Sequence, residues 1–423
     1  MNFTRIHTAL LAAAFVSAPA CANELSDLKA ALAALQAKVD QMEARQQQQA
    51  PSNAVTGGDM PGSFKLPGSN TSVKFGGYVK LDAAYDIKGD QGRAVSLADA
   101  PLNGSPGARR KGTTTLSART SRFYMQTLTN TAGGPLKTKL EFDFFTSEGS
   151  ETWTNSAHPR LRHAFGSYGG WLVGQTWSNF MDVDTLPDVL EFNGPTGQVF
   201  IRQPQIRYTL STGEHSKLAL AVENPQSDAR DAGGDVTALD RGPDFTGRWA
   251  LSGDWGHFAV RALVRDLSVE DGNGGNKANR LGYGLGVSGG VKLGARDQVV
   301  YQLNSGKGIG RYIQDATPAA AYDASTATLR AQRATGGFVG LQHTWTDALR
   351  SSLVYAQANM SNDSGFGSVA ELNKRTKQAY ANLVWSPLDQ MDVGLEYVWG
   401  ERKTEDGSKG EVQRLQTSVM YRF

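Results

Sequence analysis

Residues 72–86 read SVKFGGYVKLDAAYD, a stretch in which apolar and charged side chains take turns. Val79 and Leu81 fall on one face of an extended chain, whereas Lys80 and Asp82 fall on the other. Successive side chains of a β-strand point to opposite faces, whereas a helix repeats its apolar residues every three or four positions. The stretch therefore predicts a strand with one apolar and one charged face.

The same period of two recurs in sixteen runs between residue 72 and the C-terminal Phe423. Tight turns and long polar loops alternate between these runs, and the long loops include residues 88–115, 225–242 and 307–330. An even number of antiparallel strands, with short turns at one rim and long loops at the other, is typical of outer-membrane barrels. A soluble sandwich or propeller rarely keeps this strict alternation over so many strands.

The rest of the chain agrees with a membrane barrel. No run of about 20 apolar residues follows residue 22, so a transmembrane helix is not expected. A chain that crosses lipid with strands must close its sheet, because an open edge leaves backbone groups unpaired. The sequence therefore predicts an all-β fold, a 16-stranded antiparallel transmembrane β-barrel (a porin) over residues 71–423, preceded by a short N-terminal coiled-coil helix.

The first 22 residues have the composition of a secretory signal peptide. Arg5 supplies the positive start, an apolar stretch runs from Ala9 to Val16, and a small-x-small cleavage site ends at Ala22. The alternative is a lipoprotein signal with Cys21 as the acylated residue, although the residues before it lack the usual leucine. Cleavage after Ala22 removes the single cysteine, so no disulfide is expected in the exported chain.

Residues 23–49 carry apolar side chains at alternating spacings of three and four, which is the seam of a coiled coil. The seam consists of Leu25, Leu28, Leu32, Leu35, Val39 and Met42. Residues 50–70 are rich in Pro, Gly, Ser and Asn, which predicts a flexible linker. An amphipathic helix on the protein's own surface is the alternative, but the neighbouring polar stretch offers it nothing to pack on. We therefore expect an oligomerising coiled coil.

Several classes of function find no support in the composition and the motifs. The formal net charge is +2, whereas a nucleic-acid-binding domain is usually strongly basic. The six histidines show no metal-ligand spacing, and the chain lacks the GxSxG and phosphate-loop motifs. We therefore expect neither an enzyme nor a bound metal, cofactor or nucleic acid.

Charged residues on the inward face of the predicted strands are mostly basic. If the apolar residues face outer-membrane lipid, their neighbours face the lumen, and among these the bases outnumber the acids by about two to one. The field inside a narrow channel then favours anions, and the fork of arginine suits carboxylates. Each base alone has the simpler explanation of a solvated or salt-bridged wall residue. The bases expected to line the pore are Lys80, Arg122, Lys139, Arg160, Arg162, Arg207, Arg248, Arg261 and Arg265; other inward bases include Arg350, Arg414 and Arg422.

One long loop collects acids instead. The stretch WSNFMDVDTLPDVLEFNGP, residues 177–195, carries Asp182, Asp184, Asp188 and Glu191 and no base. A loop at membrane depth is allowed where it lines a water-filled cavity, so we expect this third long loop to fold inward near residues 178–200 and to narrow the pore. The wall residues expected opposite its acids are Arg160, Arg162, Arg207, Arg248, Arg261 and Arg265. The alternative is an ordinary extracellular loop with solvated acids.

Three stretches resemble the DcaP-like family of Gram-negative outer-membrane porins. They are VKFGGYVKLDAAYD (73–86), SARTSRFY (117–124) and, most specifically, GQTWSNFMDVDTLPDVLEFNGPTGQVFIRQPQIRYT (174–209). The heptads followed by a barrel also look like that family's layout, so the likeness covers nearly the whole mature chain. It implies a homotrimer in the outer membrane, a periplasmic coiled-coil extension, and selectivity for small organic anions such as dicarboxylates and aromatic carboxylates.

The leading hypothesis is therefore an outer-membrane porin that passes such anions by passive diffusion along a basic pore. A non-selective diffusion channel is the alternative within the same class. A structural tether, in which the coiled coil contacts the cell wall and the barrel is its anchor, is the alternative from another class. Ion selectivity separates the first two, and deletion of residues 23–49 separates the third.

Overall fold

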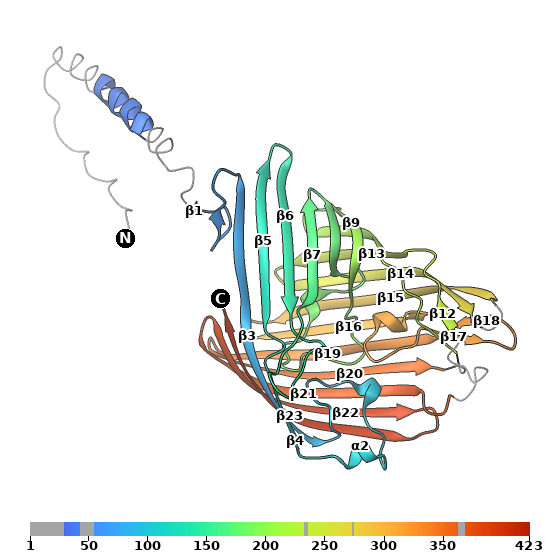
Figure 1. Cartoon of the computed structure of the whole chain (residues 1–423). Coiled ribbons are helices and arrows are strands. Elements are labelled where there is room, and N and C mark those ends of the chain that lie inside the picture. The colour runs from blue at the N-terminus through green and yellow to red at the C-terminus, as the bar shows by residue number, and fades with distance from the viewer. Residues whose placement is uncertain (1–28, 43–54, 232–235, 273–274, 363–368) are drawn as a thin grey trace.

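The computed structural model describes residues 29–42, 55–231, 236–272, 275–362 and 369–423. Within these ranges sixteen antiparallel strand positions close into a barrel, because β23, the last strand, pairs with β3, the first (Figure 1). The predicted all-β class and 16-stranded barrel are confirmed. Residues 29–42 form a helix ahead of the barrel. None of the helices in the described ranges is long and apolar enough to span a membrane.

Each wall strand pairs with its neighbours along the chain. β4 and β5 share one position in the wall, because both pair with β3. The wall strands are β3 (Thr71–Lys88), β4 (Thr113–Ser117), β5 (Arg122–Thr131), β6 (Gly134–Asp143), β7 (Arg160–Tyr168), β8 (Trp171–Trp177), β9 (Arg202–Ser211), β10 (Ser216–Glu223), β13 (Asp244–Gly253), β14 (Gly256–Asp271), β15 (Lys277–Leu293), β16 (Asp297–Lys307), β19 (Arg333–Thr346), β20 (Leu349–Ser361), β21 (Asn373–Leu388), β22 (Met391–Thr404) and β23 (Lys409–Arg422).

Smaller elements lie in the connections. They are β1 (Thr56–Gly57), β2 (Phe64–Lys65), η1 (Leu97–Asp99), α2 (Pro106–Arg109), η2 (Val183–Thr185), β11 (Ala229–Asp231), β12 (Val236–Ala238), η3 (Gly310–Tyr312), β17 (Ala320–Asp323) and β18 (Thr328–Ala331). β1 and β2 form a hairpin, and β2 pairs with β3. The stretch expected to be a flexible linker, residues 50–70, therefore contains a hairpin that is paired with the barrel.

The two faces of β3 follow the alternation of its sequence. Val79 and Leu81 are exposed on the outside of the barrel, whereas Lys80 and Asp82 are buried on the inside. An apolar exterior is what a lipid-facing barrel wall requires, and the charged interior is then available to water.

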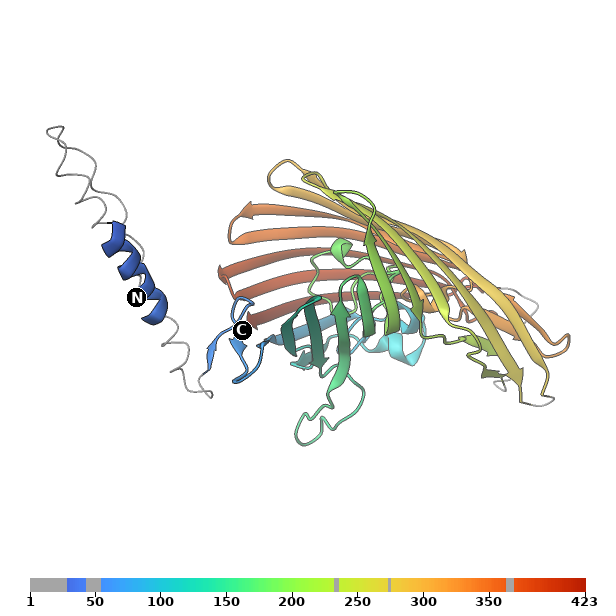
Figure 2. The ribbon, with the colours of Figure 1, turned by 90° about the horizontal axis from the view of Figure 1, so that it is seen from above.

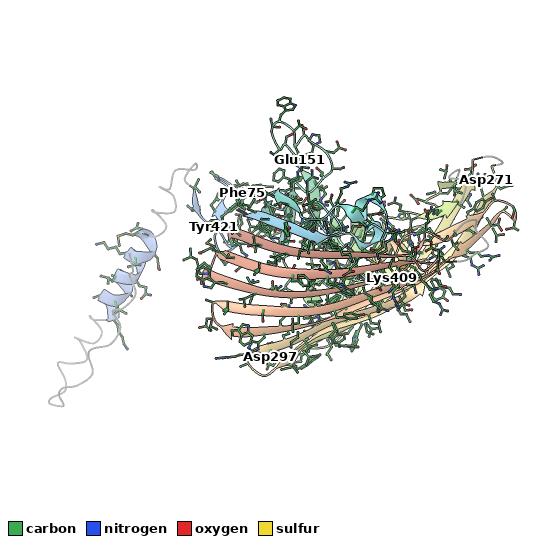
Figure 3. The ribbon with its side chains drawn as sticks, turned by 90° about the horizontal axis from the view of Figure 1, so that it is seen from below. Phe75, Glu151, Asp271, Asp297, Lys409 and Tyr421 are labelled. Atoms are coloured by element: carbon green, nitrogen blue, oxygen red, sulfur yellow. The ribbon has the colours of Figure 1, made fainter. Side chains whose placement is uncertain are left out.

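The wall is uneven in height. Strands β5 to β10 have between 7 and 10 residues, whereas β14 and β15 have 16 and 17 (Figure 2). The tight turns lie at one end of the barrel, called here the turn rim, and the long connections lie at the other, the loop rim. Figure 3 shows Phe75 and Tyr421 near the turn rim and Asp271 at the loop rim.

Two connections fold into the barrel and pack on each other. Loop 3 (residues 178–200) joins β8 to β9, and loop 6 (residues 308–332) joins β16 to β19. Val199 of loop 3 pairs with Ile313 of loop 6, and both belong to one buried apolar cluster. Gly336 of β19 permits loop 3 to approach the wall closely, because a Cβ on this residue would lie 2.7 Å from the backbone of Gly197 in the loop. An apolar core therefore fills the side of the lumen beside β14, β19 and β20.

Candidate functional site

Loop 3 crosses the lumen and is hydrogen-bonded to the inner wall. The carboxylate of Glu396 on β22 accepts the backbone N–H groups of Leu190 and Glu191 at 2.9 and 2.8 Å. Lys80 Nζ donates to the carbonyl of Leu190 at 2.9 Å. Further bonds to the wall join Thr196 to Gln378, Val199 to Gln302 and Gly194 to Tyr380. One buried carboxyl group thus satisfies two successive backbone N–H groups of the loop, so Glu396 holds the tip of the loop in place.

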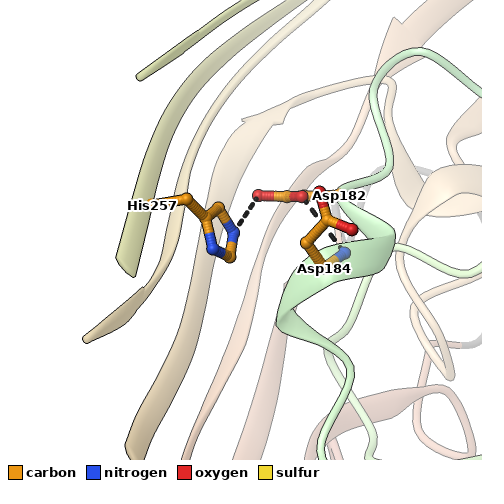
Figure 4. A group of neighbouring side chains, drawn as sticks. All are labelled: Asp182, Asp184 and His257. Carbon is orange, nitrogen blue, oxygen red and sulfur yellow. Dashed lines mark hydrogen bonds and ion pairs between the residues drawn. The ribbon is translucent and has the colours of Figure 1, made fainter. Parts of the chain in front are cut away.

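Asp182 fixes the beginning of loop 3 to the wall (Figure 4). Its carboxylate accepts Ser288 Oγ at 2.6 Å and lies 3.3 Å from His257 Nε2. Arg248 Nη1 lies 3.8 Å away. Burial acts to raise the pKa of Asp182, but the hydrogen bonds from His257 and Ser288 outweigh it and lower the pKa to about 2.

The side chains of Asp182, Asp184 and His257 each bring one potential metal ligand within 4.8 Å of the others. Arg248 already places a positive charge beside this group, which opposes a second cation. We therefore interpret the Asp182–His257 contact as an ion-paired anchor for the loop.

Glu191 fixes the tip of the loop to a second connection, loop 1 (residues 89–112). Its carboxylate accepts the backbone N–H of Val95 at 3.0 Å and lies 3.3 Å from Arg414 Nη1. Arg414 is fully buried and also donates to both oxygens of Asp86. The Glu191 side chain is fully buried and both of its oxygens are held by these contacts, so this acid is a structural anchor and not a free charge in the pore.

The other two acids of the loop are open to the lumen. Asp184 is exposed, and no base among the described residues lies within ion-pair distance of it. Asp188 is partly exposed, and its Oδ2 accepts Nε of Arg350 at 2.6 Å. The four acids predicted as one group therefore divide into two buried anchors and two lumen-facing charges.

A cavity of about 450 Å³ lies between loop 3 and the wall, and Trp177, Leu186 and Phe200 separate it from the apolar core. Its charged lining consists of Lys80, Arg122, Arg162, Arg350 and Arg422, with Asp188, Glu191 and Asp392. The five bases exceed the three acids of the lining, and Lys80, Arg122 and Arg162 also pair with acids of the wall outside it. The lining also includes the aromatic side chains of Trp177, Phe192 and Phe200.

One wall of this cavity is a network of bases that share two acids. Arg162 donates to Glu141 at 2.8 Å and to Asp143 at 2.7 Å, and Arg160 donates to both oxygens of Asp143. Lys139 lies 2.7 Å and Arg122 3.4 Å from Glu141. Four bases against two acids leave this part of the wall, strands β5 to β7, with a positive surplus.

The predicted arginines do not all reach the open lumen. Arg261 is fully buried under loop 3, where it donates to the carbonyl of Phe180 at 2.7 Å. Arg265 is buried beside loop 6 and pairs with Asp244 at 3.3 Å and with Asp228 at 3.6 Å. The inward-folded loops cover both guanidiniums, so they support the loops and do not line the cavity.

The expectation that the loop acids face six arginines needs correction. Within the described ranges Arg248 alone of the six, Arg160, Arg162, Arg207, Arg248, Arg261 and Arg265, lies within ion-pair distance of a loop acid. Arg160 and Arg162 instead pair with wall acids, and Arg207 has no ion pair among the described residues. The main partners of the loop acids are Arg350 and Arg414.

Asp244 and Arg202 also face the lumen, although their positions were not predicted from the sequence. Asp244 begins β13 and neutralises Arg265, although the alternation that places Arg248 inward also places Asp244 there. Arg202 begins β9 and lies over the ring of Trp177, with 4.4 Å between its Cζ and the ring centroid. It follows the loop directly, where no alternation indicates the direction of its side chain.

The sequence matches the family model described as DcaP outer membrane protein over residues 15–423. The chain belongs to the DcaP family of outer-membrane proteins. No curated protein sequence matches it. Family membership and barrel together identify an outer-membrane channel, and neither is typical of an enzyme.

Solved structures agree on the fold. The outer membrane channel DcaP of Acinetobacter baumannii is similar with a TM-score of 0.75 and 24% identity, over 84% of this chain and 98% of that chain. An anion-selective porin from Comamonas acidovorans gives a TM-score of 0.52 and 14% identity, over 84% of this chain and 100% of that one. Salmonella typhi OmpF in complex with daunomycin gives a TM-score of 0.55 and 12% identity, over 84% of this chain and 98% of that one. At these identities the likeness shows the porin barrel and no more.

Proposed function

We propose that the chain is a passive, anion-selective porin for small organic anions, in particular dicarboxylates or aromatic carboxylates. The observation that carries the proposal is the charge around the cavity beside loop 3, where five bases meet three acids, Asp188, Glu191 and Asp392, a surplus of two positive charges (5 − 3). A narrow channel focuses the field of its lining charges, so this surplus attracts anions and repels cations. Exposed guanidiniums add a bidentate geometry that suits carboxylates.

Loop 3 narrows this pore in the proposal. It is held near its start by Asp182 and at its tip by Glu191, so the opening beside it keeps a defined lining. Since Arg261 and Arg265 are covered, the residues proposed to act on a solute are Lys80, Arg122, Arg160, Arg162, Arg350 and Arg422, with Lys139, Arg207 and Arg248 adding to the field.

Liposome swelling tests the function directly. Vesicles that contain the purified protein should admit succinate faster than an uncharged sugar of similar size. Equal rates for the two solutes would instead support a non-selective diffusion channel.

We also propose that the chain forms a homotrimer joined by a periplasmic coiled coil. On the helix over residues 29–42, Leu32, Leu35, Val39 and Met42 are exposed in the single chain, so their seam gains by packing on other copies. Leu25, Leu28, Cys21 and the rest of the predicted signal peptide lie outside the described residues. OmpT of Vibrio cholerae, whose barrel is similar with a TM-score of 0.53, has a solved trimer form, which supports this proposal.

A further inference from the structure

We propose that Asp188 of loop 3 is an internal carboxylate that occupies an anion site on Arg350, and that a carboxylate solute displaces it during passage. The inference rests on the anion-selective function proposed above. It adds the place where the solute binds. This place lies near the turn rim, at Arg350 and Asp392, which are the second residues of β20 and β22.

Arg350 is positioned by the wall and not by the loop. Its Nη1 and Nη2 lie 3.3 and 3.1 Å from the two carboxylate oxygens of Asp392, and Nη1 also donates to Ser386 Oγ at 2.8 Å. Ser386 in turn donates to Asp392 at 2.6 Å. These contacts hold the guanidinium and leave Nε to face the lumen. The site therefore keeps its geometry when its occupant changes.

Asp188 is attached to this site by one side-chain contact. Among the described residues the carboxylate bonds to Nε of Arg350 alone, at 2.6 Å. The backbone of the same residue is held separately, because Asn382 Nδ2 donates to its carbonyl at 2.7 Å. Rotation of the Asp188 side chain therefore frees Arg350 while the loop stays in place.

Exposure makes the exchange feasible. The side chains of Asp188 and Arg350 are 38% and 33% exposed, and both line the cavity beside loop 3. Ion pairs this open to water are weak, because each partner keeps much of its hydration. The bond of Arg414 to Glu191 is the contrast, since both of those side chains are fully buried.

The charge balance favours a carboxylate as the incoming group. Arg350 and Arg422 both pair with Asp392, so without Asp188 two guanidiniums share one acid. One positive charge is then uncompensated, and a carboxylate solute restores neutrality in the geometry that Asp188 already shows. An uncharged solute gains nothing from displacing the acid.

Succinate block of the chloride current tests this exchange. Single channels are recorded in dilute KCl, and the succinate concentration that halves the current is measured for each variant. Asp188→Asn keeps the shape of the side chain and removes the competing charge, so this concentration should fall about three- to fivefold, the scale of a partly exposed ion pair. Asp184→Asn removes the same charge from the same loop, where no base pairs with it, and should change the value less than about twofold.

Arg350→Gln completes the test. It should raise the half-blocking concentration, and the double variant Arg350→Gln with Asp188→Asn should behave like Arg350→Gln alone. Asp392 keeps Arg422 and Ser386 as partners, so the wall retains its bonds in this variant. Equal effects of Asp188→Asn and Asp184→Asn, or an Asp188→Asn effect that survives the loss of Arg350, would overturn the inference.

Failure of the inference is distinguishable from failure of the proposed function. A wild-type channel that favours cations, or that succinate does not block, contradicts the function itself. An anion-selective wild-type channel whose Asp188→Asn and Asp184→Asn variants agree contradicts the displacement alone. Heat-modifiable migration on gels reports that each variant has folded into a barrel.

Discussion

Arg162→Gln and Glu141→Gln change the charge of the cavity wall in opposite directions and leave the wall intact. In the Arg162 variant Glu141 keeps Lys139, and Asp143 keeps its two bonds from Arg160. In the Glu141 variant Arg162 keeps Asp143. The β5–β7 network has four bases and two acids, 4 − 2 = +2, so the variants carry +1 and +3.

The size of the effect follows from Coulomb's law. One unit of charge about 8 Å from a passing ion changes its energy by about 0.5 kcal/mol in water and by about 2 kcal/mol at an effective dielectric constant near 20. The permeability of the anion should therefore fall about 2- to 30-fold in Arg162→Gln while that of the cation rises by a similar factor, and Glu141→Gln should change both in the opposite direction, so the anion-to-cation ratio changes by the product of the two factors. Salt near 0.1 M keeps the Debye length close to this distance, whereas 1 M salt should reduce both effects.

Reversal potentials of the two variants in a planar bilayer under a KCl gradient provide the assay. Lys292→Gln is a matched control, since it removes a lumen base on β15 that is absent from the cavity lining. Variants that shift the potential in the same direction, or by no more than the control, would refute the role assigned to this wall.

Three further predictions concern stability, pH and the N-terminal segment. Arg414→Gln leaves the buried carboxylates of Asp86 and Glu191 without their cation and should lower the free energy of unfolding by about 3–5 kcal/mol. The urea midpoint for unfolding in detergent should therefore fall, and an unchanged midpoint would contradict the anchor. Burial raises the pKa of Asp315 in loop 6 to about 6, above the usual value near 4, so loop 6 packs most stably below about pH 4 and loses this stability as the pH rises through about 6. Hydrogen exchange in loop 6, corrected for intrinsic rates, should therefore quicken from pH 5 to pH 8. Burial also raises the pKa of Asp228, which accepts the N–H of Ala319 in loop 6, to about 6, so Asp315→Asn should reduce the change and the double variant with Asp228→Asn should abolish it; a pH dependence retained in the double variant counts against burial as the cause. Deleting residues 23–49 should preserve the conductance of each channel and lower the cross-linked trimer fraction, whereas lost conductance would favour the tether hypothesis.

The barrel wall could be predicted because its signal is local. The side-chain period of a strand places Lys80 and Asp82 inward and Val79 outward whatever the remaining chain does, and the structure agrees. A bulge removes this certainty. The register shift between Glu141 and Phe142 turns His163 inward beside Arg162, which simple alternation does not allow.

Contacts inside the lumen could not be predicted, because they depend on how far each loop reaches. The segment from Ile309 to Ile313 has apolar residues that look isolated in a polar loop, yet they are buried against loop 3. Glu191 was expected opposite the arginines of β7 to β14, but the loop continues to β23 and meets Arg414. Residues far apart in the chain make these pairs, and no local pattern reports them.

The reversal potential of the wild-type protein tests the central claim most directly. Single channels in a planar bilayer under a tenfold KCl gradient at low ionic strength should give a potential with the sign of anion selectivity, because the five bases that line the cavity exceed its three acids. A potential of the cation-selective sign would contradict the account.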